Sequence, residues 1–530
     1  MNQILLALIA AFPFLLLFIL LIFRHWPAIR ALPVVWFVTL LSSVFIWRIE
    51  SVYISASFIR GVFMALEIIL IIFGAVWVLE ILKKTKHMNV IQDFLANISP
   101  DIRIQGIIIG WLFVSLMEGV AGFGTPAAIA APLLVALGFA PLLAVSVTLI
   151  ANSVATTFGA AGTPILLGFG NLGLKRIVLE QTGQMSAIFH FIASIIIPIS
   201  IVYLIVTEYK KINPNKKNIN TPIKSTIPFC VFAWLAFGIP YILSTIFIGP
   251  ELPSIIGAIF GLTVVSIAAK KGFLIPKQTM MFKKKKRKNV SLKNILISTF
   301  PYIAIVLFLM ITRTIMPLRS LIQSIQISIP SILGSSIGFS YQPLFTPAFY
   351  FILTGLISLF VFKTSFKHAK ETAKNSFMKI RNATVALIFA LGLVQLLMAS
   401  ENNLSGIASM PLILAESVGK LFGQAFPIIS PLIGAFGSFI SGSNTVSNIL
   451  FGAFQNQSAI SLGISVPIIL ALQAAGGAIG NMIAIHNVLA ASATVGLHHK
   501  ESKIIRKTIV VAILYSLIVG ILGFIAINIF

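Results

Sequence analysis

The sequence has few charged residues and almost no cysteine. Charged residues make up 10% of the 530 residues, whereas an ordinary soluble domain carries about 25%. The single cysteine, Cys230, excludes a disulfide framework and a metal cluster built on cysteines. Hydrophobic residues make up 58% of the chain, and its mean hydropathy is +1.03. This balance excludes a soluble enzyme and indicates a protein that crosses a membrane several times.

Acidic residues are scarce as well, with 13 Asp and Glu against 38 Lys and Arg, which gives a formal charge of +25. The basic residues lie in short runs between long apolar stretches, so the charge does not indicate a nucleic-acid binder. The apolar runs are continuous rather than alternating, which excludes a β-barrel. Nucleotide-binding, metalloprotease and other metal-site motifs are missing from the sequence. We therefore expect neither an enzyme nor an ATP-driven importer, and we expect no cofactor and no metal.

Apolar runs of membrane-spanning length predict about 12 helices. They fall at roughly 4–23, 33–47, 61–82, 141–162, 184–206, 226–248, 253–270, 294–312, 346–362, 382–400, 464–488 and 508–529. The first run has neither a basic leader nor a cleavage site, so we interpret it as a retained helix rather than a signal peptide. Two further apolar regions, 104–139 and 427–454, are interrupted by small and polar residues.

The distribution of basic residues predicts the orientation of the chain. Five segments, 83–103, 208–224, 270–293, 363–381 and 498–507, hold 29 of the 38 basic residues, and the loop 24–32 adds two more. Placing these segments in the cytoplasm leaves seven basic residues outside and puts both termini outside. The run Lys283–Lys288 is interpreted as an anchor at the membrane surface rather than a nucleic-acid site.

This orientation requires the two interrupted regions to enter and leave the membrane on the same side. Region 104–139 then enters from the cytoplasm and region 427–454 enters from outside, as two broken hairpins. The same order of elements follows each hairpin, which predicts an inverted-topology repeat of the kind found in secondary transporters. The predicted parts are a first membrane half at 1–225, linking helices with a basic loop at 226–293, and a second half at 294–530.

Glycine and proline recur at membrane depth in the stretch 118–164. The first hairpin turn reads Glu118-Gly-Val-Ala-Gly122-Phe-Gly124-Thr125-Pro126, and Gly159-Ala-Ala-Gly162-Thr-Pro164 follows in the next helix. Lipid cannot satisfy the backbone groups that such breaks release, so the stretch must line protein or a water-filled cavity.

The second half carries a matching pattern. The turn Ser441-Gly-Ser443-Asn444-Thr445 precedes the run Ala474-Ala-Gly-Gly-Ala-Ile-Gly480-Asn481. Two hairpin tips and two broken helices can thus meet near the middle of the membrane. Helix N-termini at such a meeting point suit a small carboxylate. The candidate contacts are Gly122, Gly124, Thr125, Asn152, Ser443, Asn444 and Thr445.

The stretch 118–164, with its Gly-Phe-Gly-Thr-Pro turn and the later Gly-Ala-Ala-Gly-Thr-Pro, closely resembles the L-lactate permease family, which includes glycolate permeases. The resemblance extends over nearly the whole chain. It implies proton-coupled uptake of L-lactate, and also D-lactate and glycolate, across a bacterial plasma membrane. The hairpin plan also resembles the wider ion-transporter superfamily, in which a Ser-Asn-Thr turn occurs at both tips and helps to bind sodium and carboxylate. Here Ser443-Asn444-Thr445 is present, but the first tip reads Gly124-Thr125-Pro126, which favours protons over sodium.

Buried titratable residues are the candidate proton carriers, because burial favours their neutral forms. Glu118, beside the first turn, is the first candidate, and its other reading is a cap for free N–H groups. Glu67 in helix 61–82 and His190 in helix 184–206 are further candidates. Lone histidines near helix ends, such as His486, are more often structural.

Three other functions compete with proton symport: sodium-coupled anion transport on the same scaffold, an anion channel and a membrane-embedded enzyme. Two occluding hairpins favour alternating access over a continuous pore, and no catalytic cluster supports an enzyme. The expected partners are a small 2-hydroxymonocarboxylate, protons and the lipid bilayer, without nucleic acid. The sequence leaves open the ranking of substrates, the ion stoichiometry and whether the chain forms a homo-oligomer.

Overall fold

The computed structural model describes residues 3–24, 26–122, 125–212, 220–282, 290–497 and 500–529. Within these residues, 11 helices are long and apolar enough to cross a membrane, or up to 13 when each of two bent pairs counts as one span. The prediction of an all-helical membrane protein is therefore confirmed. The basic run Lys283–Lys288 lies outside the described residues.

The N-terminal part holds the first spans and the first hairpin. Its helices are α1 (Gln3–Phe18, continued by a π-helical turn at Ile19–Phe23), α2 (Ala28–Phe45), α3 (Ser51–Lys84), α4 (His87–Ala96), α5 (Ile102–Ile107, continued by a π-helical turn at Ile108–Phe113), α6 (Val114–Ala121), α7 (Thr125–Ala136) and α8 (Pro141–Asn152). Helix α3 begins ten residues before the predicted span at 61–82, because the preceding segment is also helical.

The middle part joins the two hairpins. Its elements are a 3-10 turn (Ala155–Phe158), α9 (Gly159–Leu166), a 3-10 turn (Gly170–Leu172), α10 (Arg176–Ala193), α11 (Ile196–Ile212), α12 (Asn220–Lys224), α13 (Ile227–Phe247), α14 (Pro253–Lys270), α15 (Leu292–Thr314), α16 (Met316–Ser324), β1 (Ile327–Ile329), β2 (Phe339–Tyr341) and α17 (Pro347–Val361). Strands β1 and β2 form an antiparallel hairpin in which Ser328 pairs with Ser340. The sequence analysis did not predict this hairpin or α16.

The C-terminal part holds the second hairpin. Its helices are α18 (Phe366–Ala399), α19 (Met410–Phe422), a 3-10 turn (Gly423–Ala425), α20 (Phe426–Ser441), α21 (Asn444–Leu462), α22 (Val466–Gly480), α23 (Ile485–Thr494) and α24 (Glu501–Ile529). The basic segment 363–381 is mostly the first half of α18. Ser365 caps this helix by accepting a hydrogen bond from the His368 N–H, and many of the residues that follow are good helix formers.

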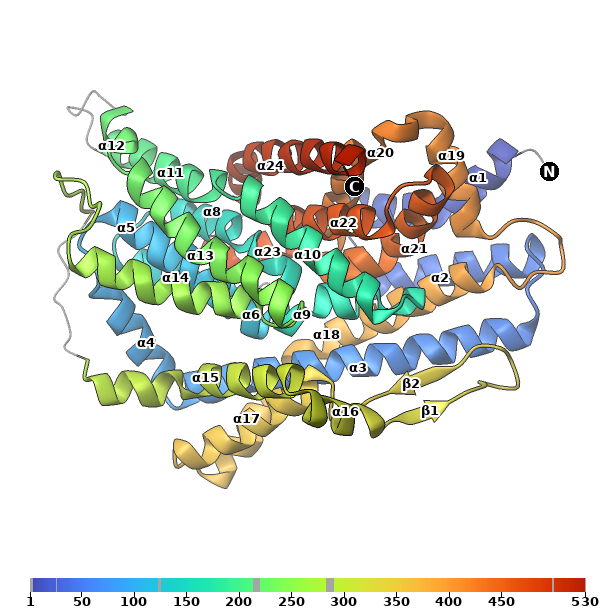
Figure 1. The fold of residues 1–530 in the computed structure, drawn as a ribbon, viewed down its shortest axis with the longest axis horizontal. Helices are drawn as coiled ribbons and strands as arrows, with labels where there is room; N and C mark the ends of the chain where they lie inside the picture. The colour runs from blue at the N-terminus through green and yellow to red at the C-terminus, as the bar shows by residue number, and fades with distance from the viewer. Residues whose placement is uncertain are drawn as a thin grey trace.

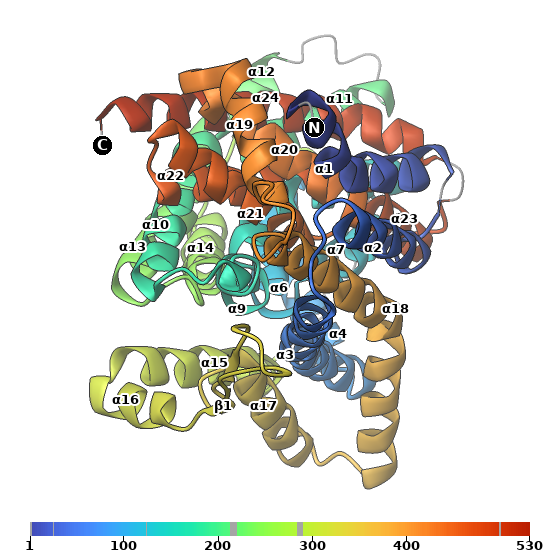
Figure 2. The ribbon, with the colours of Figure 1, turned by 90° about the vertical axis from the view of Figure 1, so that its right-hand side faces the viewer.

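The helices form two groups. Helix α3 packs against α17 and α18, and α15 packs against α17 and α4. Most of the other helices, including both hairpins, form the second group, in which α20 packs on α22 and α13 on α14. Figure 2 shows α15, α16 and α17 at the bottom of the view, below the helices of the second group.

Several segments to which the charge pattern assigns opposite sides lie at opposite ends of the molecule. In Figure 1 the N-terminus and the turn between α2 and α3 lie at the right, whereas α4 and α12 lie at the left. An isolated bridge between Ile49 and Asn403 joins two of the segments that are predicted to lie outside. Which end faces the cytoplasm stays a prediction.

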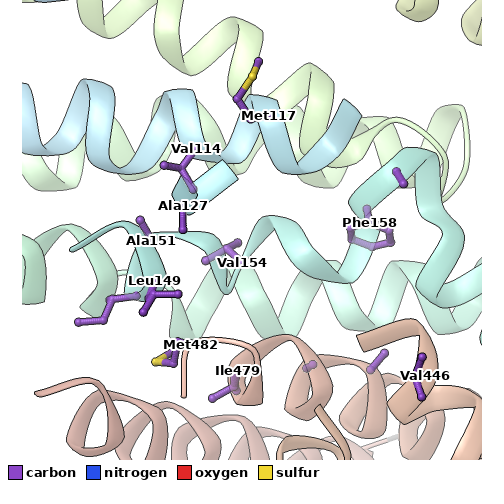
Figure 3. Close-up of a cluster of buried hydrophobic side chains, with 14 of the residues drawn as sticks. Val114, Met117, Ala127, Leu149, Ala151, Val154, Phe158, Val446, Ile479 and Met482 are labelled. Carbon is purple, nitrogen blue, oxygen red and sulfur yellow. The ribbon is translucent and has the colours of Figure 1, made fainter. Parts of the chain in front are cut away.

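Apolar side chains pack closely around the meeting point of the two hairpins. Figure 3 shows Val114 of α6, Ala127 of α7 and Leu149 of α8 in the same cluster as Val446 of α21 and Ile479 of α22. All five side chains are buried. Since a dense interior resists small deformations, this core sets the relative positions of the hairpin tips in this structure.

Candidate functional site

Both hairpin tips turn at a glycine in the left-handed region. Helix α6 ends at Gly122 with φ +59°, and α20 ends at Gly442 with φ +74°. At each tip the glycine N–H returns to a carbonyl four residues earlier, Glu118 at 3.0 Å and Ser438 at 2.8 Å. Side chains are strained at such φ values, so the two tips need glycine at matching places.

The second tip leads directly into a capped helix. The Ser443 hydroxyl accepts a hydrogen bond from the Val446 N–H at 3.4 Å, and the Asn444 amide donates to the Ala474 carbonyl at 3.0 Å. The tip is thereby tied to α22. At the first tip, Gly124 lies outside the described residues. Thr125 begins α7, and its side chain is not described.

The helix that follows the first hairpin breaks by a left-handed turn. Ala160 has φ +43°, Ala161 has φ +54° and Gly162 has φ +77°. Non-glycine residues in this region cost roughly 1–2 kcal/mol each, so the surrounding structure must hold the turn in place. Backbone strain of this kind is frequent at binding sites.

The helix that follows the second hairpin also breaks, but after its glycine run. Helix α22 continues through the run to Gly480, and α23 starts at Ile485. Between them, the Asn487 side-chain amide donates to the Asn481 side chain, to the Asn481 carbonyl at 3.2 Å and to the Gly442 carbonyl at 3.4 Å. Asn487 therefore joins this break to the second tip.

The two tips and the two breaks line one cavity, which we call the tip cavity. Its described lining is Glu118, Gly122, Thr156, Gly159, Ala160, Pro164, Gly442, Ser443, Asn444, Thr445 and Asn481. The cavity measures about 10 Å³, which is roughly enough for one water molecule. The structure is therefore a closed state of the site, too small for a lactate-sized molecule.

Glu118 is the single charged side chain among the described residues that line the tip cavity. It is 2% exposed, and its Oε2 has no hydrogen-bond partner in the described part of the chain. The Asn152 side chain hydrogen-bonds to the carboxyl. A Cβ at Gly159 would lie 2.6 Å from Oε1. The break in the first half therefore closes directly over this carboxyl.

The structure brings together five of the candidate residues from the sequence. Glu118, Gly122, Ser443, Asn444 and Thr445 line the tip cavity. Asn152 does not line it but reaches the site through the Glu118 carboxyl. The roles of these residues stay predictions.

The other two proton candidates lie elsewhere. His190 is fully buried, with Nε2 2.6 Å from the Thr157 hydroxyl and Nδ1 2.7 Å from the Tyr515 hydroxyl. Both ring nitrogens are thus hydrogen-bonded, as in a structural histidine. Glu67 lines a second cavity of about 410 Å³ together with Arg176, Glu251 and Arg313, which we call the arginine cavity.

Sequence reasoning missed several residues of these cavities. Thr156 and Asn481 line the tip cavity and lie within hydrogen-bonding distance of each other, at 3.4 Å. Arg313 ends an apolar helix and is 3% exposed. An ionisable residue in such a place is itself a signal for function, but the sequence analysis treated Arg313 only as part of a charge count. Among the described residues, no group of three or more His, Cys, Asp or Glu could hold a metal ion.

Sequence comparisons with known proteins agree on one family. A family model described as L-lactate permease matches residues 6–530. The L-lactate permease of Escherichia coli strain K12 is 31% identical over 88% of this chain and 86% of its own length. The glycolate permease GlcA of the same strain is 26% identical over 97% of this chain and 94% of its own length. The YdaH transporter of Alcanivorax borkumensis aligns with 87% of this chain and 85% of its own at a TM-score of 0.43 and 12% identity.

Proposed function

Because this chain belongs to the L-lactate permease family, we propose that it takes up L-lactate across the bacterial plasma membrane by proton symport. D-lactate and glycolate are further proposed substrates, since both share the 2-hydroxycarboxylate group and the relatives include a glycolate permease. Membership in a permease family already makes it a multi-pass transporter and not an enzyme.

The observation that carries the proposal is the isolation of Glu118. No cation accompanies this carboxyl among the described residues that line the tip cavity. Two carboxylates in so small a space repel each other strongly unless one is protonated. A proton on Glu118 would remove the repulsion, and its loss would expel the substrate. Substrate and proton would then enter together without net charge.

The second half of the cavity supplies groups for the substrate carboxylate and hydroxyl. Helix α21 begins at Asn444, directly at the second tip, so the N-terminus of this helix and its free N–H groups lie at the tip cavity. Ser443, Thr445 and Asn481 add hydroxyl and amide groups. Because the cavity holds about one water in this closed state, binding requires the tips to move apart. This need supports alternating access rather than a permanent channel.

Sodium coupling is the second candidate, favoured by one observation. Three buried oxygens near the tips, on Glu118, Asn152 and Asn444, have no hydrogen-bond partner in the described part of the chain. Hard cations prefer oxygen ligands of this kind. The glycine and proline of the first tip, where the wider superfamily has Ser-Asn-Thr, argue against this candidate.

Uptake of labelled L-lactate into proteoliposomes tests the proposal, with proton and sodium gradients imposed separately. We expect an inward proton gradient to drive accumulation without sodium. Uptake that requires a sodium gradient and ignores pH would replace proton symport by the second candidate. A protein that moves no lactate in counterflow would contradict the proposed substrate.

We also propose that both termini and the segment 401–409 lie outside the cell. Leu404 is 69% exposed and Lys293 is exposed, so single cysteines at these positions can report the orientation in a Cys230→Ser background. Cys230 itself is buried. In intact cells, an impermeant maleimide should label Leu404→Cys and not Lys293→Cys. The reverse pattern would invert the orientation.

A further inference from the structure

The arginine cavity is separated from the tip cavity by the left-handed turn of α9. Ala160 and Pro164 face the tip cavity, whereas Ala161 and Thr163 face the arginine cavity. The arginine cavity is about 410 Å³ in volume, about forty times the tip cavity, and is large enough for a small carboxylic acid with water. A short segment of the α9 backbone therefore separates the larger arginine cavity from the closed tip cavity.

Two arginines share one carboxylate oxygen in the arginine cavity. Arg176 Nη2 lies 2.9 Å from Glu251 Oε1, and Arg313 Nε lies 3.0 Å from the same atom. The second oxygen of Glu251, Oε2, is buried without a hydrogen-bond partner in the described part of the chain. Since a guanidinium can hold a carboxylate through two parallel bonds, neither arginine uses its full capacity on Glu251.

Arg313 is held in position by other contacts. Its Nη2 donates to the Phe345 carbonyl, and its guanidinium lies 3.7 Å from the centre of the Phe345 ring. The Thr346 hydroxyl, also on the cavity wall, is buried and unpartnered among the described residues. A fixed guanidinium beside an unused hydroxyl matches the carboxylate and hydroxyl of a 2-hydroxy acid.

Glu251 also braces the wall between the two cavities. A Cβ at Gly162 would collide with the Pro250 carbonyl and would lie 3.1 Å from the Glu251 Cα. The loop that carries Glu251 therefore presses against the left-handed turn. A ligand that draws Arg313 or Arg176 away from Glu251 would loosen this brace.

We propose that the arginine cavity is a second binding site for a small carboxylate, in which Arg313 and Arg176 take the substrate before it reaches the tip cavity. The inference rests on the proposed lactate transport. The bound carboxylate competes with Glu251 for the arginines, and the released loop lets the α9 turn open. Glu67 faces the same cavity from α3, so the site holds two carboxyls and is not a simple basic pocket.

This site is tested by the apparent KM for labelled L-lactate in proteoliposomes of the full chain. Two substitutions should shift this KM in opposite directions. Arg313→Gln removes a ligand and should raise the KM about tenfold or more. Glu251→Gln removes the competitor and should lower the KM by about threefold or more. A purely structural ion pair predicts that both changes impair transport in the same direction, because each leaves a buried charge unpaired.

Two further variants leave the buried ion pairs intact. Gln342 lies on the cavity wall and is half-buried, so Gln342→Glu should raise the KM and Gln342→Lys should lower it. If Arg313→Gln does not fold, the two Gln342 variants still test the second binding site. Arg381→Gln is the matched control, since Arg381 is exposed on α18 and does not line the cavity. Its KM should stay within about twofold of the parent.

The outcomes separate this inference from the proposed function. Opposite KM shifts for Arg313→Gln and Glu251→Gln, or for the two Gln342 variants, support the second site. Counterflow of lactate in the parent with no opposite shift in either pair overturns the site and leaves the proposed function standing. A parent that moves no lactate overturns both.

Discussion

The two halves of the tip cavity have nearly the same backbone plan and different chemistry. Each half contributes a tip that turns at a left-handed glycine, Gly122 or Gly442, and a helix that breaks beside the cavity. The first half adds a carboxyl, Glu118, and the second adds amides and hydroxyls, among them those of Ser443 and Asn444. The two sides of the cavity therefore differ in charge, with a carboxyl on one side and polar neutral groups on the other.

The two breaks are also held by different kinds of interaction, charged in the first half and neutral in the second. The first break is pressed by the loop of Glu251, which two arginines hold through charge. The second break is held by the Asn487 amide, which donates to Asn481 and to the Gly442 carbonyl. If the halves have separate tasks, changes in the first should affect coupling and changes in the second should affect substrate affinity.

The largest effect is expected for Glu118→Gln, which imitates a permanently protonated carboxyl. This variant should still exchange lactate in counterflow but should lose uphill accumulation by at least about tenfold, together with its pH dependence. Glu118→Asp keeps the acid and should be impaired but coupled. Counterflow and gradient-driven uptake in the same vesicles provide the measurement.

Glu416→Gln is the matched control for Glu118→Gln, because it removes a carboxyl that lies exposed on α19. It should behave like the parent protein. If Glu118→Gln accumulates lactate as well as the parent at every pH, Glu118 is a structural cap. The first half then loses its proposed task, and Glu67 and His190 become the next candidates.

In the second half, Asn444→Asp should weaken lactate binding without removing the proton requirement. The substitution puts a second carboxylate into a cavity that already holds Glu118, and it removes the donor to the Ala474 carbonyl. We expect the KM to rise about tenfold or more, since like charges at close range cost several kcal/mol. Asn444→Ala removes only the hydrogen bond and should raise the KM less.

The difference between Asn444→Asp and Asn444→Ala isolates the charge. Asn402→Asp, an exposed position, controls for added charge on the surface. Equal KM values for the two Asn444 variants would show that charge at the second tip does not oppose the substrate.

The meeting of the two tips and the two breaks could be predicted where local chemistry and charge were sufficient. Glycine, serine and asparagine at membrane depth cannot face lipid, and this argument, together with the orientation from the basic residues, predicted two hairpins that meet. The position of the second break was less accurate, because Ala474–Gly480 remains helical and the break follows at Asn481. A buried glycine run indicates close packing as well as a break.

The arginine cavity could not be found by the same argument. Glu251 is 75 residues from Arg176 and 62 residues from Arg313 in the sequence. Their meeting depends on the packing of α10, α15 and the loop between α13 and α14, which no local pattern encodes. The first half of α18 was not predicted as a helix for a different reason, because its lysines were counted as charge and not as helix formers.

A pair of glycine substitutions should distinguish the proposed roles of the two halves. A Cβ at Gly159 would lie 2.6 Å from Glu118 Oε1, and a Cβ at Gly477 would collide with Asn444 Oδ1. Displacing the side chain that clashes with the new Cβ should cost each variant about 1–3 kcal/mol of stability. Gly159→Ala should therefore alter the pH dependence of uptake, whereas Gly477→Ala should raise the KM for lactate several-fold.

Gly170→Ala is the control for both substitutions, because no atom lies within 4 Å of its Cβ position. It should leave both quantities unchanged. An identical loss of transport in the Gly159→Ala and Gly477→Ala proteins, without either signature, would contradict the division between the halves.

The smallest expected effect is the pH dependence of the stability that each break receives from its contacts. Burial opposes ionisation of Glu251, but Arg176 and Arg313 outweigh it, so the pKa of Glu251 lies below its ordinary value of 4.5. A carboxyl with a lowered pKa stabilises the folded state above its ordinary pKa, and that contribution is lost as the pH falls through the lowered value. The melting temperature of the parent should therefore exceed that of Glu251→Gln by a constant margin from pH 7 to about 5. Below about pH 4.5 the margin should narrow by roughly a few degrees.

Asn487→Ala supplies the comparison with the second half, because an amide does not titrate. This substitution removes the hydrogen bonds to Asn481 and to the Gly442 carbonyl, so it should lower the melting temperature by the same margin at pH 7 and at pH 4. Thermal unfolding in detergent at several pH values measures both margins. If the margin for Glu251→Gln stays constant to pH 4, ionised Glu251 contributes nothing to stability. The first break is then held by packing alone, as Pro250 packs on Gly162, and the proposed competition between substrate and Glu251 loses its energetic basis.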